Sequence, residues 1–269
     1  MTEFTDLEFE VDDPVAIIRL NRPEKLNAFT YHTLAEIRRA IDAAAADTKV
    51  VGIIITGNGR GFSAGLDSLS LAESTADGGR SGAAASASST ELPGLFTYFL
   101  DVPKPIIAAV NGVAAGGGLV LAAKCDVRIA STSASFTTVF LKRGLIAEHG
   151  MSWLLPRLVG PGAALDLLWT SKRIDAAEAH RIGLVDYVCE PGELLGRARA
   201  YIAEIASNAA PLAVADTKRL VYSHMGAAYP DAFRDADTAQ WQALARPDAL
   251  EGSRALLEKR TAVFQRLGE

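Results

Sequence analysis

Two glycine-rich segments hold the groups of this sequence that are best suited to chemistry. The first is GNGRGFSAG at residues 57–65, and the second is the triplet Gly116-Gly117-Gly118. Each follows an apolar run typical of a buried strand and precedes a stretch expected to be helical. The first N–H groups of a helix lack acceptors, so two such ends aimed at one point would stabilise a thioester oxyanion or enolate there. In the simpler interpretation, these glycines only permit tight turns and close packing.

The first segment also resembles a dinucleotide-binding loop, but its spacing is wrong. A G-x-G-x-x-G fingerprint that starts at Gly57 needs a glycine at position 62, where the sequence has Phe62. An acidic residue, Asp77, follows about 20 positions on. It lies in a stretch rich in Ala, Ser and Gly rather than at the end of a strand. A dinucleotide site is therefore not expected.

Residues 61–65 match the G-x-S-x-G pattern of serine hydrolases, with Ser63 as the nucleophile. That motif needs a strand that runs directly into the turn, and here the apolar run ends at Thr56. Three histidines follow, and none lies in a segment that predicts a strand-end loop for a catalytic base; they are His149, His180 and His224. A serine hydrolase is therefore a distant alternative.

Composition limits the class of protein. The chain has 269 residues, 49% of them hydrophobic, and a net charge of −5, which argues against nucleic acid or an anionic membrane as the main partner. No apolar run reaches the roughly 20 residues of a membrane helix, and residues 1–13 do not resemble a signal peptide. We expect a cytoplasmic protein. Its two cysteines, Cys125 and Cys189, are expected to be free thiols rather than a disulfide or metal ligands.

The elements that must position the glycine segments follow from hydrophobic periodicity. Thr30 is expected to cap a helix that runs to about Ala46. The expected strands are residues 7–10, 15–20, 50–56, 105–110, 126–130 and 183–189. Residues 72–89 resemble a flexible loop, and the chain after residue 161 is otherwise mostly helical. This order predicts an α/β core at residues 1–200 and a helical region at residues 201–269.

Seven ordered motifs span nearly the whole chain. They are NRPEKLNAF (21–29), GFSAGLDSLSL (61–71), AAVNGVAAGGG (108–118), CDVRIAS (125–131), RGLIAEHGMSWLLPRLVG (143–160), IDAAEAHRIGLVDYV (174–188) and EKRTAVF (258–264). Together they resemble the crotonase superfamily, the enoyl-CoA hydratase/isomerase family. The resemblance implies a crotonase-like spiral of ββα turns, followed by helices that trimerise. It also implies a homotrimer or a hexamer built as a dimer of trimers.

The same resemblance implies where an acyl-CoA substrate binds. The oxyanion donors are the backbone N–H groups of Leu66 and Gly117. The thioester and pantetheine path follows Leu66, Asp67, Ser68 and Leu69, and the coenzyme A nucleotide meets Lys25, Leu26, Ala28 and the carbonyl of Ala64. Coenzyme A enters as part of the substrate, and neither a permanently bound cofactor nor a metal is implied.

Two positions depart from the pattern of the best-known hydratases, which hold and activate water with two glutamates. The matched motifs place those positions at Val120 and Phe140, whose side chains cannot transfer a proton. They are expected to form part of the acyl-binding wall instead. Hydration by two glutamates is therefore excluded.

One other acid is available, Glu148, at a position where some family members, double-bond isomerases among them, carry Asp or Glu. A single carboxylate can move a proton between the α and γ carbons of an enolate, provided that its pKa is raised by an apolar wall. In the alternative interpretation, Glu148 only decorates or caps a surface loop. His149 is expected to be an ordinary structural histidine, although it could orient Glu148 or act itself. Asp67 is expected to cap a helix or contact the ligand rather than transfer a proton.

The sequence therefore predicts an enzyme that acts on an acyl-CoA thioester through an enolate held in an oxyanion hole. Double-bond isomerisation and one-acid hydration or dehydration are both open, with isomerisation favoured by the two missing glutamates. A catalytically weak acyl-CoA-binding homologue is the main competing hypothesis.

Overall fold

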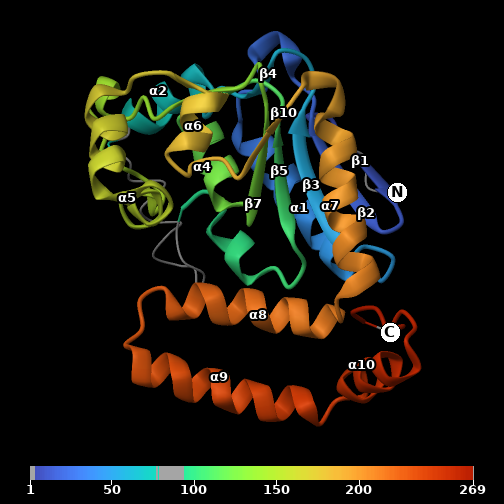
Figure 1. Cartoon of the computed structure of the whole chain (residues 1–269). Helices are drawn as coiled ribbons and strands as arrows, with labels where there is room; N and C mark the ends of the chain where they lie inside the picture. Colours follow the sequence, from blue (N-terminus) through green and yellow to red (C-terminus); the bar gives the residue numbers. More distant parts are fainter. Residues whose placement is uncertain (1–3, 77, 79–93, 269) are drawn as a thin grey trace.

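The computed structural model describes residues 4–76, 78 and 94–268, whose strands form a six-stranded and a four-stranded sheet (Figure 1). The larger sheet contains, in spatial order, β1 (Leu7–Asp12), β2 (Val15–Leu20), β3 (Gly52–Gly57), β5 (Ile106–Val110), β7 (Val127–Ser131) and β10 (Tyr187–Cys189). The smaller sheet contains β4 (Gly61–Ser63), β6 (Val113–Ala115), β8 (Ser135–Thr137) and β9 (Ile174–Asp175). β1 is antiparallel to β2, and the other neighbours in the larger sheet are parallel.

The chain passes from the larger sheet to the smaller one three times in succession, at β3–β4, β5–β6 and β7–β8. Helix α2 (Ser68–Ala76) follows the first of these pairs, and α4 (Gly117–Lys124) follows the second. Such a repeated order winds the chain into a spiral, which confirms the predicted fold class. The sequence did not predict the smaller sheet, because its strands have only two or three residues and show no periodicity.

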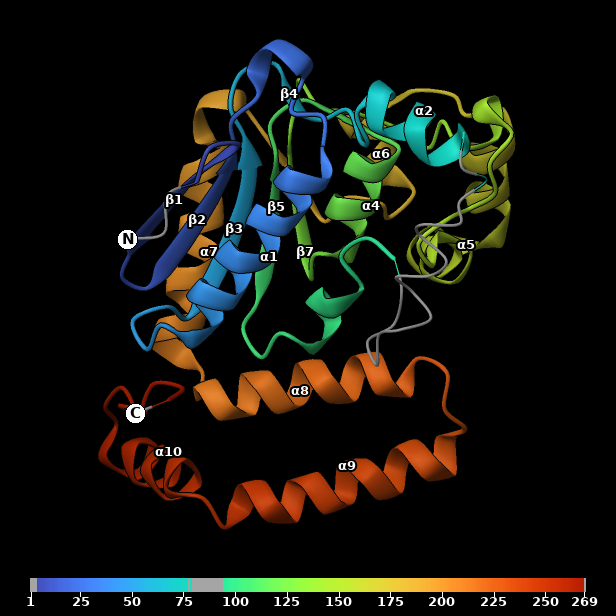
Figure 2. The same ribbon diagram turned by 180° about the vertical axis from the view of Figure 1, so that it is seen from behind.

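β3 shows why the central strands appear in the sequence as continuous apolar runs. Side chains alternate between the two faces of a strand, so Ile53 and Ile55 join one core while Ile54 joins the other. Helix α1 (Tyr31–Ala46) covers the first face and α7 (Leu194–Asn208) the second, as the two opposite views show (Figures 1 and 2). The hydroxyl of Thr30 accepts the N–H of Thr33 at 3.1 Å and caps α1, as predicted.

The remaining elements complete the second half of the chain and the connections of the first. They are the 3-10 helices η1 (Pro23–Lys25), η2 (Thr97–Asp101), η3 (Leu141–Arg143) and η4 (Pro191–Glu193), and the helices α5 (Met151–Thr170), α6 (Ala176–Arg181), α8 (Pro211–His224), α9 (Tyr229–Leu244) and α10 (Pro247–Glu258). No helix in the described residues is long and apolar enough to cross a membrane.

Two expectations about segment boundaries differ from the structure. Residues 72–76 belong to α2 and are not a loop, while most of the remaining predicted loop, residues 77 and 79–89, lies outside the described residues. The predicted strand at residues 183–189 is shorter, because only Tyr187–Cys189 pair with β7.

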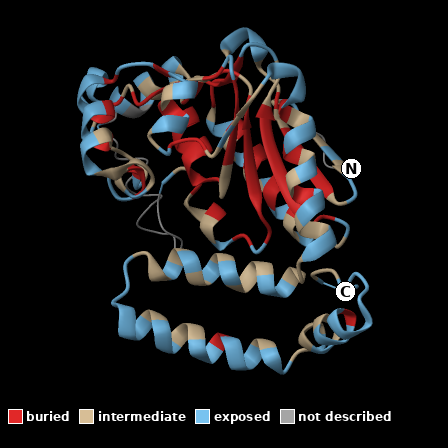
Figure 3. Ribbon diagram, viewed as in Figure 1, coloured by how far each residue is buried: buried red, intermediate tan, exposed pale blue. Residues whose placement is uncertain are grey.

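The C-terminal helices differ from the core in their burial. Helix α7, which contains residue 200, packs on the larger sheet, so the change of environment comes only after Asn208. Helices α8 to α10 extend beside the core, and most of their residues are exposed or half-buried (Figure 3). Several large apolar side chains there face solvent in the single chain; they are Val221, Tyr229, Phe233, Trp241, Leu244, Leu250, Leu256 and Leu257.

Candidate active site

The two glycine-rich loops meet at Gly65 and Gly117. Gly65 has a φ of +86°, and a Cβ added to it would lie 2.7 Å from the carbonyl oxygen of Ala115 and 2.7 Å from the nitrogen of Gly117. A Cβ added to Gly117 would lie 3.4 Å from the nitrogen of Leu66. The backbone nitrogens of Leu66 and Gly117 therefore flank the same contact between loops that are about 50 residues apart in the sequence.

Both N–H groups are left without an acceptor by the local backbone geometry. Leu66 forms a parallel bridge with Phe29, in which Phe29 donates to the Gly65 carbonyl and accepts from the Asp67 N–H, each at 2.8 Å. In a parallel bridge, the N–H of the residue between these two bonds points away from the partner strand. Gly117 is the first residue of α4, where no intrahelical acceptor exists. Neither N–H group donates a hydrogen bond to any of the described residues, as an oxyanion site requires.

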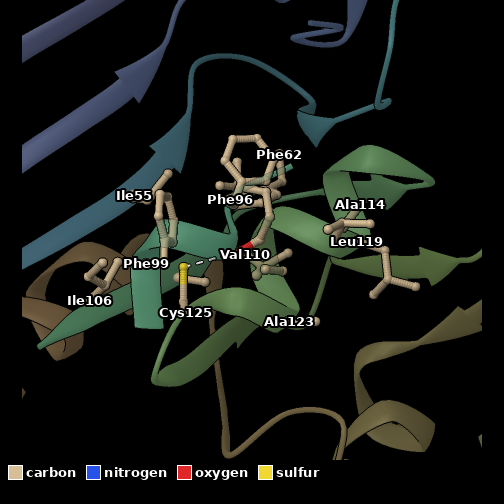
Figure 4. Packing of buried hydrophobic residues seen from close by; sticks show 14 of the residues in the cluster. Ile55, Phe62, Phe96, Phe99, Ile106, Val110, Ala114, Leu119, Ala123 and Cys125 are labelled. Carbon is tan, nitrogen blue, oxygen red and sulfur yellow. Dashed lines mark hydrogen bonds between the residues drawn. The ribbon is translucent and has the colours of Figure 1, made fainter. Parts of the chain in front are cut away.

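A cluster of buried apolar side chains packs against the two glycine-rich loops. Phe62, Phe96 and Leu119 are almost fully buried and pack with residues of β3 and β5 (Figure 4). The thiol of Cys125, in the same cluster, donates to the Leu121 carbonyl at 3.3 Å, and burial raises its pKa. Cys125 and Cys189 are both free, as predicted. The close packing fixes the positions of the donors, which is the main requirement for electrostatic stabilisation.

Ser63 is structural in this arrangement. β4 does run directly to Ser63, contrary to the expectation that no strand enters the turn. Its side chain is fully buried, however, and its hydroxyl donates to the Asn27 carbonyl at 2.8 Å while accepting the Gly65 N–H at 3.1 Å. These bonds join the loop of residues 63–66 to residue 27 and leave no exposed nucleophile at Ser63.

A Ser63→Ala variant is therefore expected to keep its activity on acyl-CoA esters and to lose about 1–2 kcal/mol in the free energy of unfolding. The loss arises because two buried hydrogen-bonding groups of the backbone lose their partner. Urea denaturation of both proteins measures the difference. An ester-cleaving activity that disappears in the variant, with stability unchanged, would instead support a hydrolase.

Val120 and Phe140 are both buried in the core, and their place in an acyl-binding wall stays a prediction. Val120 is fully buried on α4, and Phe140 is buried immediately before η3. Neither side chain has a group that can exchange a proton. The structure therefore offers no acid at the two positions where a two-glutamate hydratase needs one.

Glu148 lies in the loop between η3 and α5, and its carboxylate is partly covered, with 33% of the side chain exposed. Burial raises the pKa of this carboxyl, while the Arg143 guanidinium opposes the rise. The N–H of Met151 is accepted by the backbone carbonyl of Glu148 rather than by its side chain. No capping bond to the Glu148 carboxylate is formed by the described residues.

His149 has a structural contact. Its Nδ1 accepts the backbone N–H of Leu95 at 3.2 Å, and a Leu95 methyl lies 3.4 Å from the Cβ position of Gly117. Burial and the nearby Lys124 cation lower the pKa of His149 to about 4, so the ring is neutral at physiological pH. Its Nε2 lies 4.0 Å from a Glu148 oxygen, beyond hydrogen-bonding distance. His149 therefore connects the Glu148 loop to the wall beside Gly117.

The residues expected to meet coenzyme A occupy adjoining loops. The Ala64 N–H donates to the Leu26 carbonyl at 2.9 Å, which places the loop of Leu26 and Ala28 beside that of Ala64. Lys25 is exposed at the end of η1. Further along, Ser68 and Leu69 are exposed at the start of α2.

Asp67 caps α2, as expected, because its carboxylate accepts the N–H of Leu69 at 3.0 Å. The helix begins at Ser68, two residues later than the oxyanion position. An ion pair at 3.9 Å joins Asp67 to Arg22, which steadies the same loop. Asp67 is therefore occupied by structural contacts.

Two residues of this region were not predicted from the sequence, Leu95 and Lys124. Leu95 joins His149 to Gly117, as described above, and it carries no chemical group that a motif could reveal. Lys124 is the last residue of α4 and is buried close to His149. The signal in the sequence that could have revealed Lys124 was a lysine within the apolar stretch GGLVLAAK.

Comparison with known proteins places the chain in a family. The sequence model of the enoyl-CoA hydratase/isomerase family matches residues 10–266. The chain is 36% identical over 260 residues to the short-chain-enoyl-CoA hydratase of Clostridium acetobutylicum, with 96% of this chain and 97% of that protein covered. It is 37% identical over 262 residues to the crotonyl-CoA hydratase of Syntrophomonas wolfei, with 97% and 98% covered.

The similarity extends to three dimensions. A crystal structure of an enoyl-CoA hydratase from Bacillus anthracis matches with a TM-score of 0.88 at 30% identity, over 97% of this chain and 99% of that one. The spiral between two sheets, with glycine loops meeting at Gly65 and Gly117, is thus the crotonase fold. The chain belongs to the enoyl-CoA hydratase/isomerase family of enzymes.

Proposed function

We propose that this enzyme binds an acyl-CoA thioester and stabilises its enolate, with Glu148 moving a proton between the α and γ carbons. The observation that carries the proposal is the pair of unpaired N–H groups of Leu66 and Gly117 at one contact between two loops. A thioester oxygen that accepts both donors gains negative charge when the α proton leaves, and fixed donors stabilise that charge most strongly. The reaction is then the isomerisation of an enoyl-CoA double bond.

Glu148 suits the role of proton shuttle for two reasons. Its carboxylate is partly buried yet not engaged by the described residues, and its pKa is raised by burial. A carboxylate with a raised pKa is a stronger base and holds a proton more readily, so it can remove the α proton and return it at the γ carbon. Val120 and Phe140 stand at the two positions assigned to the hydratase glutamates, and neither side chain can act as a second acid.

One-acid hydration is the second candidate, because the relatives compared above are named hydratases. In that reaction, Glu148 alone would deprotonate water and the α carbon would take up a proton. A catalytically weak acyl-CoA binder is the third, and it would form the complex without releasing product. We place the coenzyme A nucleotide at Lys25, Leu26, Ala28 and Ala64, and the pantetheine along residues 66–69, because these loops adjoin the oxyanion site. No permanently bound cofactor is needed for these reactions.

Mass spectrometry with a panel of 2-enoyl-CoA and 3-enoyl-CoA esters in deuterium oxide separates these functions. Isomerisation converts one ester into the other with deuterium uptake and no added water. Hydration adds the mass of water, and a catalytically weak homologue binds the ester tightly without converting it. Conversion of neither ester, together with no binding, would refute the proposal.

The pH dependence of kcat/KM supplies a further prediction about Glu148. Glu148 must be ionised to act as a base. The activity is therefore expected to rise with pH through the pKa of Glu148, which lies above the ordinary value of 4.5. Arg143 lowers that pKa, and an Arg143→Gln variant is therefore expected to move the acid limb of the profile to higher pH. Arg234→Gln, on the exposed face of α9, is the control for loss of a charge. A limb that stays in place, or moves to lower pH, would contradict the assignment.

We also propose that the protein assembles as a homotrimer or a dimer of trimers through α8 to α10. The exposed apolar side chains of these helices support this, since large apolar patches in water usually mark protein interfaces. Light scattering of the purified protein gives the mass of the assembly, and a monomer would contradict the proposal.

A further inference from the structure

Lys124 is a buried lysine of α4 that the proposed mechanism does not use. It is only 4% exposed, and its ammonium forms no hydrogen bond or ion pair with any part of the chain that the structure describes. Burial lowers its pKa, and no carboxylate of the described residues raises it. Another buried lysine of the fold is satisfied in a different way, since Lys104 donates to the carbonyls of Ala44 and Asp47. A buried unpaired charge is costly, so Lys124 needs an explanation.

The position of Lys124 connects it to the candidate active site. Gly117, Val120 and Lys124 follow one another at spacings of three and four residues, which places them on one face of α4. Lys124 lies about 10 Å along the helix axis from the oxyanion donor at Gly117. The Cα–Cβ bonds of a helix tilt toward its N-terminus, so the Lys124 side chain leaves the helix in the direction of Gly117.

The surroundings of the ammonium belong to the same wall. A Cβ added to Gly150 would lie 3.3 Å from the Lys124 nitrogen, and the Lys124 charge lowers the pKa of His149. Gly150 is the N-cap residue of α5, which packs beside α4 (Figures 1 and 2). The nearest acid in this loop, Glu148, is influenced by Arg143 and not by Lys124. The ammonium therefore lies beside Gly150 and near the neutral ring of His149, in the loop that carries Glu148.

We propose that Lys124 is a specificity-determining residue that binds a carboxylate at the far end of the acyl chain. The proposal rests on the function proposed above, because the thioester oxygen at Leu66 and Gly117 fixes where the acyl chain begins. From that point, a chain of a few carbons that passes Val120 reaches the ammonium. The phosphates of coenzyme A are assigned to the loops of Lys25 and Ala64, on the other side of the thioester, and do not supply the anion. The substrates are then CoA monothioesters of dicarboxylic acids.

Binding to saturated thioesters tests this inference without relying on turnover. Glutaryl-CoA and valeryl-CoA have acyl chains of equal length and differ in ending with a carboxylate or a methyl group; adipyl-CoA and hexanoyl-CoA form a longer pair. We expect titration calorimetry to show at least about tenfold tighter binding of a carboxylate-ended ester than of its methyl-ended partner. A Lys124→Met variant is expected to remove that preference, while its unchanged affinity for the methyl-ended esters shows that it folds. Lys172→Met removes an exposed lysine as the control.

The inference and the proposed function fail in different ways. Wild-type protein that binds the methyl-ended esters as tightly as the carboxylate-ended ones, or a preference that survives Lys124→Met, would overturn the inference even if enoyl-CoA esters are converted. A carboxylate preference that depends on Lys124, in a protein that converts no enoyl-CoA ester, would uphold the inference and overturn the catalytic proposal. Failure of every thioester to bind would overturn both.

Discussion

A Glu148→Gln variant is expected to lose about 10²- to 10⁴-fold in kcat, with the Kd for a saturated acyl-CoA changed by less than a few-fold. The amide has nearly the size and shape of the carboxylate but cannot accept a proton. Because the Glu148 carboxylate is not hydrogen-bonded by the described residues, its replacement breaks no structural contact. The loss should therefore fall on the chemical step alone, and single-turnover kinetics together with binding measurements will separate the two effects.

Two control variants sharpen this test. Glu204→Gln changes an exposed acid on α7 and is expected to have wild-type activity. His149→Gln removes the ring that accepts the Leu95 N–H and sits 4.0 Å from Glu148, and it is expected to cost far less kcat than Glu148→Gln. A Glu148→Gln enzyme with full activity would remove Glu148 from the mechanism. If His149→Gln loses more kcat than Glu148→Gln, the proton transfer would be assigned to His149 instead.

The second large effect is expected from removing one oxyanion donor. Proline at position 117 lacks the N–H, and proline is tolerated at the first residue of a helix, which Gly117 occupies. We expect Gly117→Pro to lower kcat by about 10²- to 10³-fold, the usual effect of losing one such donor. The helix should remain intact, because no intrahelical bond uses this N–H.

Gly117→Ala is the matched control for the added atoms. Its Cβ meets the Gly65 Cα at 3.3 Å and the Leu66 nitrogen at 3.4 Å, which is tight but requires only a small shift. Alanine keeps the N–H, so the difference in kcat between the alanine and proline variants measures the donor itself. If both variants lose the same activity, crowding at Gly65 explains the effect and the oxyanion assignment at Gly117 is wrong.

The elements of the core could be predicted because their signals are local. The run of residues 50–56 is apolar on both faces of β3, and the Thr30 cap and the stripe of α1 follow helical spacing. The strands β4, β6, β8 and β9 carry no such signal, because two or three residues show no period. They pair only because the larger sheet brings successive loops side by side, which is a property of the whole fold.

The site was predictable where backbone geometry is set by glycine and where motifs resemble a family. Gly65 and Gly117 lie in contact and Glu148 is half-buried in its loop, while the roles of Leu66, Gly117 and Glu148 stay predictions. The role of Ser63 could not be decided from the sequence, since G-x-S-x-G fits both a nucleophile and the buried bridge that the structure shows. Lys124 was also missed, because burial of a cation becomes visible only once α5 is packed beside α4.

Exchange of the α protons of butyryl-CoA in deuterium oxide, followed by NMR, tests most directly whether the enzyme stabilises an enolate. This saturated ester can neither isomerise nor add water, so α-proton loss reports the enolate alone. We predict that the wild-type enzyme replaces the α protons with deuterium, and that Gly117→Pro and Glu148→Gln both slow the exchange by about 10²-fold or more. No exchange by wild-type enzyme saturated with butyryl-CoA would contradict the account.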